Sequence, residues 1–181
     1  ISARKRGEQL LALEHAVSRG LAGADNVPAA MKALMRSVCE TQGWECGRYF
    51  RLDDEAGVLR FDEFWSMPEA KLDEFIARSR AVSYTPGAGL TGRVWQSGEA
   101  LWVPDIASDP RATQRIGQDT GLRGAFVFPV MAEGKVIGVL GFNSRQVREP
   151  DERLLMAARV IGSQIGQFLQ RKHAEESLRR F

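Results

Sequence analysis

The fold of this 181-residue chain is constrained most strongly by two segments in its C-terminal half that are apolar on both faces. Arg123–Met131 and Lys135–Ser144 flank the dipeptide Glu133-Gly134. Apolar runs of this length are typical of strands buried on both sides, and a two-residue connection ending in Gly indicates a tight hairpin. The sequence therefore predicts an antiparallel hairpin at the centre of a sheet that other elements cover on both faces.

Both ends of the chain show helical periodicity. The segment from Ser2 to about Ala24 repeats apolar residues three and four positions apart, at Leu10, Leu13, Val17 and Leu21. A second helix is capped around Asp151 and continues to the end of the chain, with an apolar seam at Leu154, Ala158, Ile161, Ile165 and Phe168. One domain is expected to cover only part of two such stripes, so we predict a parallel homodimer through the terminal helices. The alternative is that both helices pack on their own sheet.

The middle of the chain alternates helices and strands. Turn and cap signals predict helices over 26–42, 68–80 and 90–96, strands over 44–52, 58–66 and 101–103, and a helical turn from Asp109-Pro110 to near Gly121. Strands bracketed by helices around an antiparallel hairpin indicate an α+β fold.

Composition excludes several classes of protein. Hydrophobic residues make up 44% and charged residues 27%, which is ordinary for a globular chain. The net charge of +2 gives no basic surface for nucleic acid, and no apolar run is long enough for a membrane segment. Cys39 and Cys46 are too few for a disulfide framework, so we expect free thiols and a cytoplasmic location.

Catalytic and metal-binding motifs are weak. His15 and His173 lie in opposite terminal helices, far from the two cysteines, and we expect no metal and no catalytic residue. The motif Gly87-x-Gly89-x-x-Gly92 lacks the preceding strand and the βαβ context of a dinucleotide fingerprint, so a tight turn that starts a helix is the favoured interpretation. Free amides at that helix start are nevertheless suited to an anionic ligand.

The order of several motifs resembles the GAF domains of bacterial sensors. The resemblance spans about residues 27–170 and rests on Gly87-Ala88-Gly89-Leu90-Thr91-Gly92-Arg93, Trp102-Val103-Pro104-Asp105-Ile106, Gly124-Ala125-Phe126-Val127-Phe128-Pro129-Val130 and Val136-Ile137-Gly138-Val139-Leu140. The flanks resemble linkers to PAS domains. We therefore expect a linker helix over 1–24, a GAF domain over 25–170 and a linker helix over 171–181.

The resemblance implies a five- or six-stranded antiparallel sheet with helices on both faces and a pocket formed by residues 67–122. The cofactor stays unknown, because that segment lacks a Cys for a bilin and a His for haem, and the polar groups suited to a cyclic nucleotide are missing. We predict a ligand-binding pocket lined by Tyr49, Trp65, Arg93, Asp105, Arg115 and Phe128. An ordinary core with surface arginines is the alternative for any one of them.

The expected function is sensory. A small ligand or a partner would bias the terminal helices and, through them, an output domain such as a histidine kinase, a diguanylate cyclase or a phosphodiesterase. The alternatives are a ligand-free dimerisation spacer and a free-standing methionine sulfoxide reductase of the GAF fold. The reductase would need reactive cysteines, and Cys39 and Cys46 fit that role badly.

Overall fold

The protein is described by a computed structural model that covers residues 2–112 and 119–179. Its strands form one six-stranded sheet in the order β3-β2-β1-β6-β5-β4, and every neighbouring pair is antiparallel. The strands are β1 (Cys46–Asp53), β2 (Val58–Ser66), β3 (Ser83–Tyr84), β4 (Leu101–Val103), β5 (Gly124–Ala132) and β6 (Lys135–Ser144). The α+β fold predicted from the sequence is confirmed.

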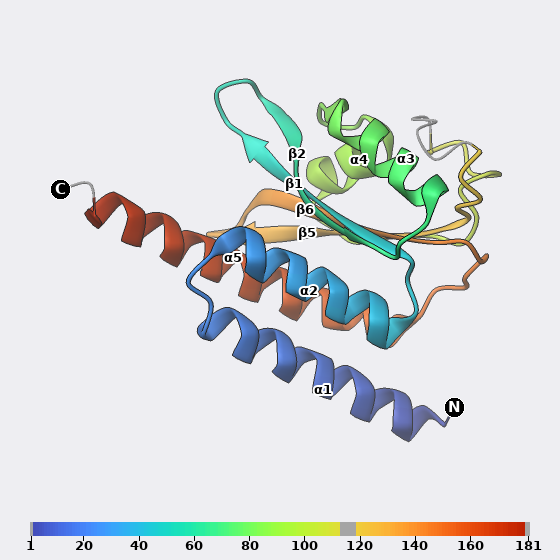
Figure 1. The fold of residues 1–181 in the computed structure, drawn as a ribbon, viewed down its shortest axis with the longest axis horizontal. Coiled ribbons are helices and arrows are strands. Elements are labelled where there is room, and N and C mark those ends of the chain that lie inside the picture. Colours follow the sequence, from blue (N-terminus) through green and yellow to red (C-terminus); the bar gives the residue numbers. More distant parts are fainter. Residues whose placement is uncertain (1, 113–118, 180–181) are drawn as a thin grey trace.

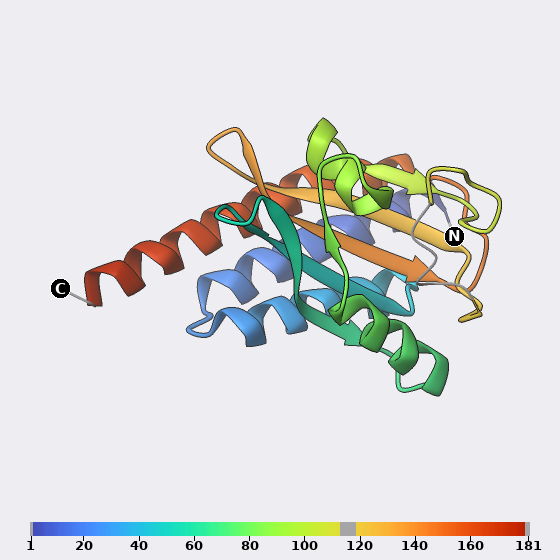
Figure 2. The same ribbon diagram turned by 90° about the horizontal axis from the view of Figure 1, so that it is seen from above.

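Helices cover both faces of this sheet (Figure 1). The long helices are α1 (Ala3–Ala22), α2 (Val27–Gln42) and α5 (Glu152–Arg179), and the short ones are α3 (Ala70–Arg80) and α4 (Gly89–Ser97). Two of the long helices, α2 and α5, lie on one face of the sheet and α1 packs on their outer side, whereas the two short helices lie on the opposite face (Figure 1 and Figure 2). The helical turn predicted from Asp109 to Gly121 falls largely on residues 113–118, outside the described residues.

Local signals explain several of these boundaries. Asn26 caps α2 by accepting a hydrogen bond from the Ala29 amide, and Gly43 ends that helix in the left-handed conformation. The β5–β6 connection places both Glu133 (φ 52°) and Gly134 (φ 75°) in the left-handed region, as a type I′ hairpin turn requires. The predicted hairpin is confirmed, with a non-glycine residue at its first turn position.

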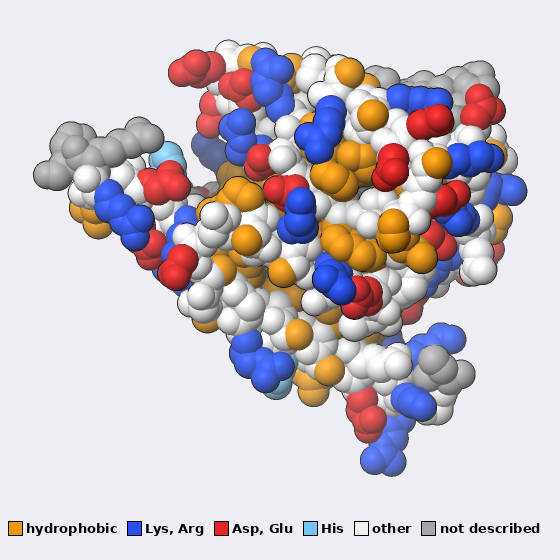
Figure 3. All heavy atoms as spheres, viewed as in Figure 1, with side chains coloured by type: hydrophobic (Ala, Val, Ile, Leu, Met, Phe, Trp, Pro, Cys, Tyr) orange, Lys and Arg blue, Asp and Glu red, His pale blue; other side chains and the backbone are white. Residues whose placement is uncertain are grey.

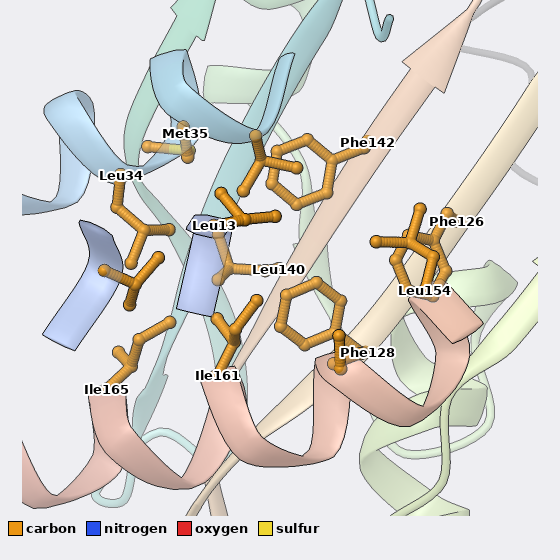
Figure 4. Close-up of a cluster of buried hydrophobic side chains, with 14 of the residues drawn as sticks. Leu13, Leu34, Met35, Phe126, Phe128, Leu140, Phe142, Leu154, Ile161 and Ile165 are labelled. Atoms are coloured by element: carbon orange, nitrogen blue, oxygen red, sulfur yellow. The ribbon is translucent and has the colours of Figure 1, made fainter. Parts of the chain in front are cut away.

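The main core lies between the long helices and the sheet. Side chains from α1, α2 and α5 meet those of β5 and β6, as the close-up in Figure 4 shows for Leu13, Leu34, Ile161, Phe128 and Leu140. A smaller cluster on the opposite face contains Phe50, Leu59, Tyr84, Val94, Val127 and Val139. Consecutive residues of β5 and β6 therefore enter different cores, which explains why both strands are apolar on both faces.

The predicted helical seams are covered within one chain. Leu10, Leu13, Val17 and Leu21 of α1 are buried, and so are Leu154, Ala158, Ile161, Ile165 and Phe168 of α5. The premise that one domain leaves these stripes uncovered was wrong, because α1 packs against α2 and α5 while α5 packs on β5. Homodimerisation stays a prediction without this argument.

Helices α1 and α5 run side by side in the same direction. The Arg153 guanidinium donates to the carbonyl oxygen of Ala3 near the start of both helices. Eighteen residues further along each helix, Arg171 Nη2 donates to the carbonyl oxygen of Leu21 at 3.2 Å. The two helices therefore stay parallel over about 27 Å of their axes.

Candidate functional site

A cavity of about 50 Å³ lies between the sheet and the short helices. Its walls come from β1, α3, β3, α4, the segment after β4, β5 and β6, through Arg48, Phe75, Tyr84, Leu90, Thr91, Ile106, Ala112, Ala125, Val127 and Asn143. Most of these side chains are apolar, and a few polar groups converge on the same space. This is the composition of a small-molecule site, although the volume is well below the 300–1,000 Å³ or so of a drug-sized pocket.

Arg48 is the charged residue of this cavity. It projects from the central strand β1 and is only 7% exposed. Its Nη1 donates to Ser79 Oγ at 3.1 Å, and its Nη2 donates to Asn143 Oδ1 at 3.4 Å. Among the residues that the structure describes, none is a hydrogen-bond partner of its buried Nε.

Two aromatic rings lie against the Arg48 guanidinium. The central carbon of that group lies 4.4 Å from the ring centre of Phe75 and 5.2 Å from that of Phe50. Such contacts stabilise a cation by about 0.5–2 kcal/mol, which is less than the several kcal/mol required to bury one. The aromatic contacts therefore compensate only part of the desolvation of Arg48.

Counter-charges are missing around this guanidinium. In the part of the chain that the structure describes, no carboxylate oxygen lies within 4.0 Å of Arg48. The carboxylates of the segment after β4 are engaged elsewhere, because Asp105 pairs with Arg123 at 2.5 Å and Asp109 pairs with Arg111 at 2.7 Å. Arg48 thus presents an unneutralised positive charge to the cavity.

The start of α4 forms the wall opposite the sheet. Gly87 (φ 82°) and Gly89 (φ 61°) make the turn before this helix, and a side chain on Gly92 would collide with the carbonyl oxygen of Thr85. These backbone conformations and the close contact at Gly92 explain the glycine spacing, so no bound nucleotide is needed to account for it. Ala88 is the N-cap and offers no side-chain acceptor, so the first-turn amides of the helix lack capping by a side chain.

The two cysteines are unsuited to nucleophilic chemistry. Cys39 packs in the core under the long helices, and Cys46 packs under α3 on the opposite face of the sheet. Burial raises the pKa of Cys46 to about 12, an effect that the nearby charge of Arg48 only partly opposes, and burial also raises the pKa of Cys39. Both residues are free thiols with little thiolate at neutral pH.

The structure does not bring the predicted site residues together. Tyr49, Phe128 and Trp65 belong to or pack against the core under α1, α2 and α5, on the face opposite the cavity. Contrary to the prediction for Tyr49, this side chain packs under the long helices, whereas its neighbour Arg48 lines the cavity from the other face of β1. Arg93 is exposed on α4.

Asp105 does not line the cavity either. Asp105 forms a bidentate pair with Arg123, whose hydrogen bonds lower the pKa of that carboxyl to about 2. Arg115 lies outside the described residues. The sequence analysis missed three residues of the cavity, Arg48, Thr91 and Asn143. The one sequence signal that pointed to the cavity was a lone arginine inside the run Cys46–Phe50, whose residues are all buried.

The described residues hold neither a candidate metal site nor a membrane-spanning helix. Within residues 2–112 and 119–179, no group of three or more His, Cys, Asp or Glu side chains is arranged to hold a metal ion. None of the helices in those ranges has the length and apolar character needed to cross a membrane. Positive and negative side chains are interspersed on the face seen in Figure 3.

Comparison with known proteins agrees with this architecture. A family model described as a GAF domain matches residues 24–170. The fold is similar to the GAF domain of a phosphoenolpyruvate-protein phosphotransferase from Coxiella burnetii, with a TM-score of 0.80, 16% identity, and coverage of 94% of this chain and 98% of that one.

Two further structures share the fold. A free methionine-R-sulfoxide reductase from Neisseria meningitidis, solved with its substrate, gives a TM-score of 0.78 at 16% identity, with 97% of this chain and 96% of that chain covered. A putative GAF sensor protein from Burkholderia vietnamiensis gives 0.72 at 16% identity, with 91% and 96% covered. The family model, the sheet order and the two helical layers agree, and the chain belongs to the GAF domain family.

Proposed function

We propose that this GAF domain is a regulatory module that binds a small ligand in the cavity containing Arg48. The observation that carries the proposal is the cavity itself, which elements distant in sequence enclose and into which a buried, partly unsatisfied guanidinium projects. Buried polar atoms normally find a partner, so an orphaned one in a cavity favours a ligand that supplies it.

The strands offer a mechanical route from the cavity to the terminal helices. Val127 lines the cavity, while its neighbour Phe128 packs in the core under α5. Arg48 and Tyr49 are divided between the two faces of β1 in the same way. A ligand that shifts β1 or β5 would therefore move side chains on both faces, and we propose that α1 and α5 pass this change to an output domain of the histidine kinase, diguanylate cyclase or phosphodiesterase class.

A reductase is the competing function because proteins of that activity share this fold. Methionine sulfoxide reduction needs a nucleophilic thiol that the substrate can reach. Cys39 and Cys46 are buried, their pKa values are raised by burial, and neither lines the cavity. These features favour a regulatory role without catalysis.

Native mass spectrometry of freshly purified protein tests the proposal. We expect a stoichiometric small ligand on the wild type and its loss in Ala112→Leu, which would fill the cavity from a half-buried position. The matched control is Ala107→Leu, an exposed residue of the same segment that does not line the cavity. Reproducible absence of any ligand from wild-type protein would instead favour the dimerisation spacer.

We also propose that two copies associate through their terminal helices, without nucleic acid as a partner. The seams are used inside the domain, so the contact would use outer residues such as Leu11, Met156 and Val160, which are 56%, 71% and 44% exposed. Light scattering at micromolar concentration tests this association, and a monomer at the highest soluble concentration would contradict it.

A further inference from the structure

The inference concerns the chemical class of the ligand and rests on the proposed function of the same cavity. We infer that the cavity binds a small monocarboxylate whose carboxylate group pairs with Arg48. The geometry of the guanidinium, the donors around it and the volume of the cavity each support this class.

The charge balance of the cavity calls for an anion. A buried cation without a counter-charge is strongly unfavourable, and a bound carboxylate would neutralise it in a low-dielectric site. The two acidic side chains of the segment after β4 already pair with arginines, Asp105 with Arg123 and Asp109 with Arg111. A bound carboxylate would supply the negative charge that these residues do not.

The guanidinium is positioned to bind a planar group through its edge. Phe75 and Phe50 both lie against the Arg48 guanidinium, so the acceptor must reach donors that these rings leave open. Nη1 is engaged by Ser79, whereas Nε is free and Nη2 has a second hydrogen beyond the one directed at Asn143. Adjacent Nε and Nη donors match the two oxygens of a carboxylate.

Neighbouring groups add donors and fix the position of Arg48. Ser79 Oγ accepts from Arg48 while donating to the carbonyl oxygen of Phe75 at 2.8 Å, so its hydroxyl is oriented toward its helix. Thr91 is 4% exposed, lines the cavity and lies in the first turn of α4. Its hydroxyl and the positive end of the helix dipole would both favour a negative ligand.

The volume of the cavity limits the size of the ligand, and the single guanidinium limits its charge. A water molecule needs about 10–15 Å³ by this measure, so 50 Å³ accommodates a molecule of only a few heavy atoms. Leu90 and Val127 offer apolar contacts for a short aliphatic chain. One guanidinium supplies one positive charge, which suits a monoanion such as propionate better than the dianion of phosphate.

Titration of the purified domain with propionate tests the inference directly. We expect saturable binding by calorimetry and a concentration-dependent rise in Tm, and neither effect with the neutral analogue propionamide or with phosphate at equal concentration. Binding should also shift the ¹H–¹⁵N resonance of one buried arginine Nε, and this resonance should be missing in Arg48→Met.

Variants separate a ligand-binding arginine from a structural one. Arg48→Met should weaken propionate binding by at least about tenfold, because a charge-assisted hydrogen bond is lost. Without propionate its Tm should equal or exceed that of the wild type, since an unneutralised buried charge has been removed. Arg51→Met is the control on the same strand, because Arg51 is exposed and pairs with Asp62. This control should bind propionate normally.

The remaining outcomes contradict the inference. If Arg48→Met is unfolded, Thr91→Val provides the decisive measurement, and unchanged propionate affinity in that variant overturns the inference. Equal binding of propionate and propionamide also overturns it. A neutral ligand found on the wild-type protein by mass spectrometry refutes the carboxylate but leaves the proposed function standing, whereas complete absence of a ligand removes both.

Discussion

Gly166 of α5 lies so close to the carbonyl oxygen of Met131 in β5 that a Cβ atom there would overlap that oxygen. One turn earlier, Gly162 has the same relation to the carbonyl oxygen of Pro129. Both glycines therefore face the backbone of β5. They let α5 approach the backbone of its own sheet.

We expect Gly166→Ala to lower the free energy of unfolding by about 1–3 kcal/mol, because the helix must move away from β5 to admit the new methyl group. Gly20→Ala is the matched control, since no atom lies within 4 Å of the corresponding Cβ position in α1. The control should stabilise the protein by about 0.5–1 kcal/mol through helix propensity. Urea unfolding measures both changes, and equal effects in the two variants would contradict the packing argument.

Glu133→Asn should stabilise the β5–β6 hairpin. Glu133 adopts φ 52°, a conformation that asparagine tolerates better than glutamate in type I′ turns. The expected gain in unfolding free energy is about 0.5–1 kcal/mol, measured by urea unfolding. Glu55→Asn in the β1–β2 connection serves as control, and a loss of stability in Glu133→Asn would argue against strain at this turn.

The Asp105–Arg123 pair should make stability depend on acidic pH. Hydrogen bonds from Arg123 lower the pKa of Asp105 to about 2 in the folded protein, below its ordinary value near 3.8. Ionised Asp105 therefore stabilises the fold above about pH 4, and this contribution disappears as the pH falls toward 2.

Asp105→Asn should consequently be less stable than the wild type at neutral pH, with a difference that shrinks between pH 4 and 2. Thermal unfolding across this range measures the effect. Asp54→Asn, in the exposed β1–β2 turn, is the matched control. A difference between Asp105→Asn and wild type that stays constant with pH would contradict the assigned ion pair.

Both thiols should resist modification in the folded protein. With the pKa of Cys46 raised to about 12 by burial, its thiolate fraction at pH 8 falls on the order of a thousandfold below that of an exposed cysteine. Reaction with Ellman's reagent should therefore be slow in buffer and should release two equivalents in denaturant. Rapid labelling of native protein would revive the reductase alternative.

Ile161→Glu should unfold the domain rather than dissociate a dimer. Ile161 is 2% exposed inside the core, where a carboxylate would be buried without a partner. Val160→Glu, one residue earlier, is the matched control because Val160 is 44% exposed. Circular dichroism should report folded Val160→Glu protein, and light scattering of that variant should report loss of any dimer formed through the outer face. A folded Ile161→Glu domain would contradict the assigned core.

Periodicity was sufficient to predict most elements of this fold. The buried stripes of α1 and α5 and the hairpin at Glu133-Gly134 follow directly from spacing, because burial on one face leaves a regular trace in the sequence. The partner of each stripe was not predictable in the same way. The spacing of apolar residues in a stripe is the same whether a second copy of the chain or the chain's own sheet covers that stripe.

The candidate site was harder to predict because strand alternation gives two faces without saying which elements cover each. Tyr49 and Arg48 are adjacent in β1 and point to opposite faces of the sheet. Assigning the wrong face to the cavity therefore selects the core residue Tyr49 in place of Arg48. The aromatic residues offered no help, since both cores contain them. A charged side chain within a run of buried positions was the informative exception.

The parallel course of α1 and α5 gives the domain a direction. Their contacts at Ala3 with Arg153 and at Leu21 with Arg171 keep the two helices aligned, and α5 continues past the sheet while α1 turns back into α2 (Figure 1). A unit joined ahead of α1 and another joined after α5 would therefore lie at opposite ends of the long axis. Repeats of such a domain would form a linear stack with a constant polarity, because the two points of attachment lie at opposite ends of each unit.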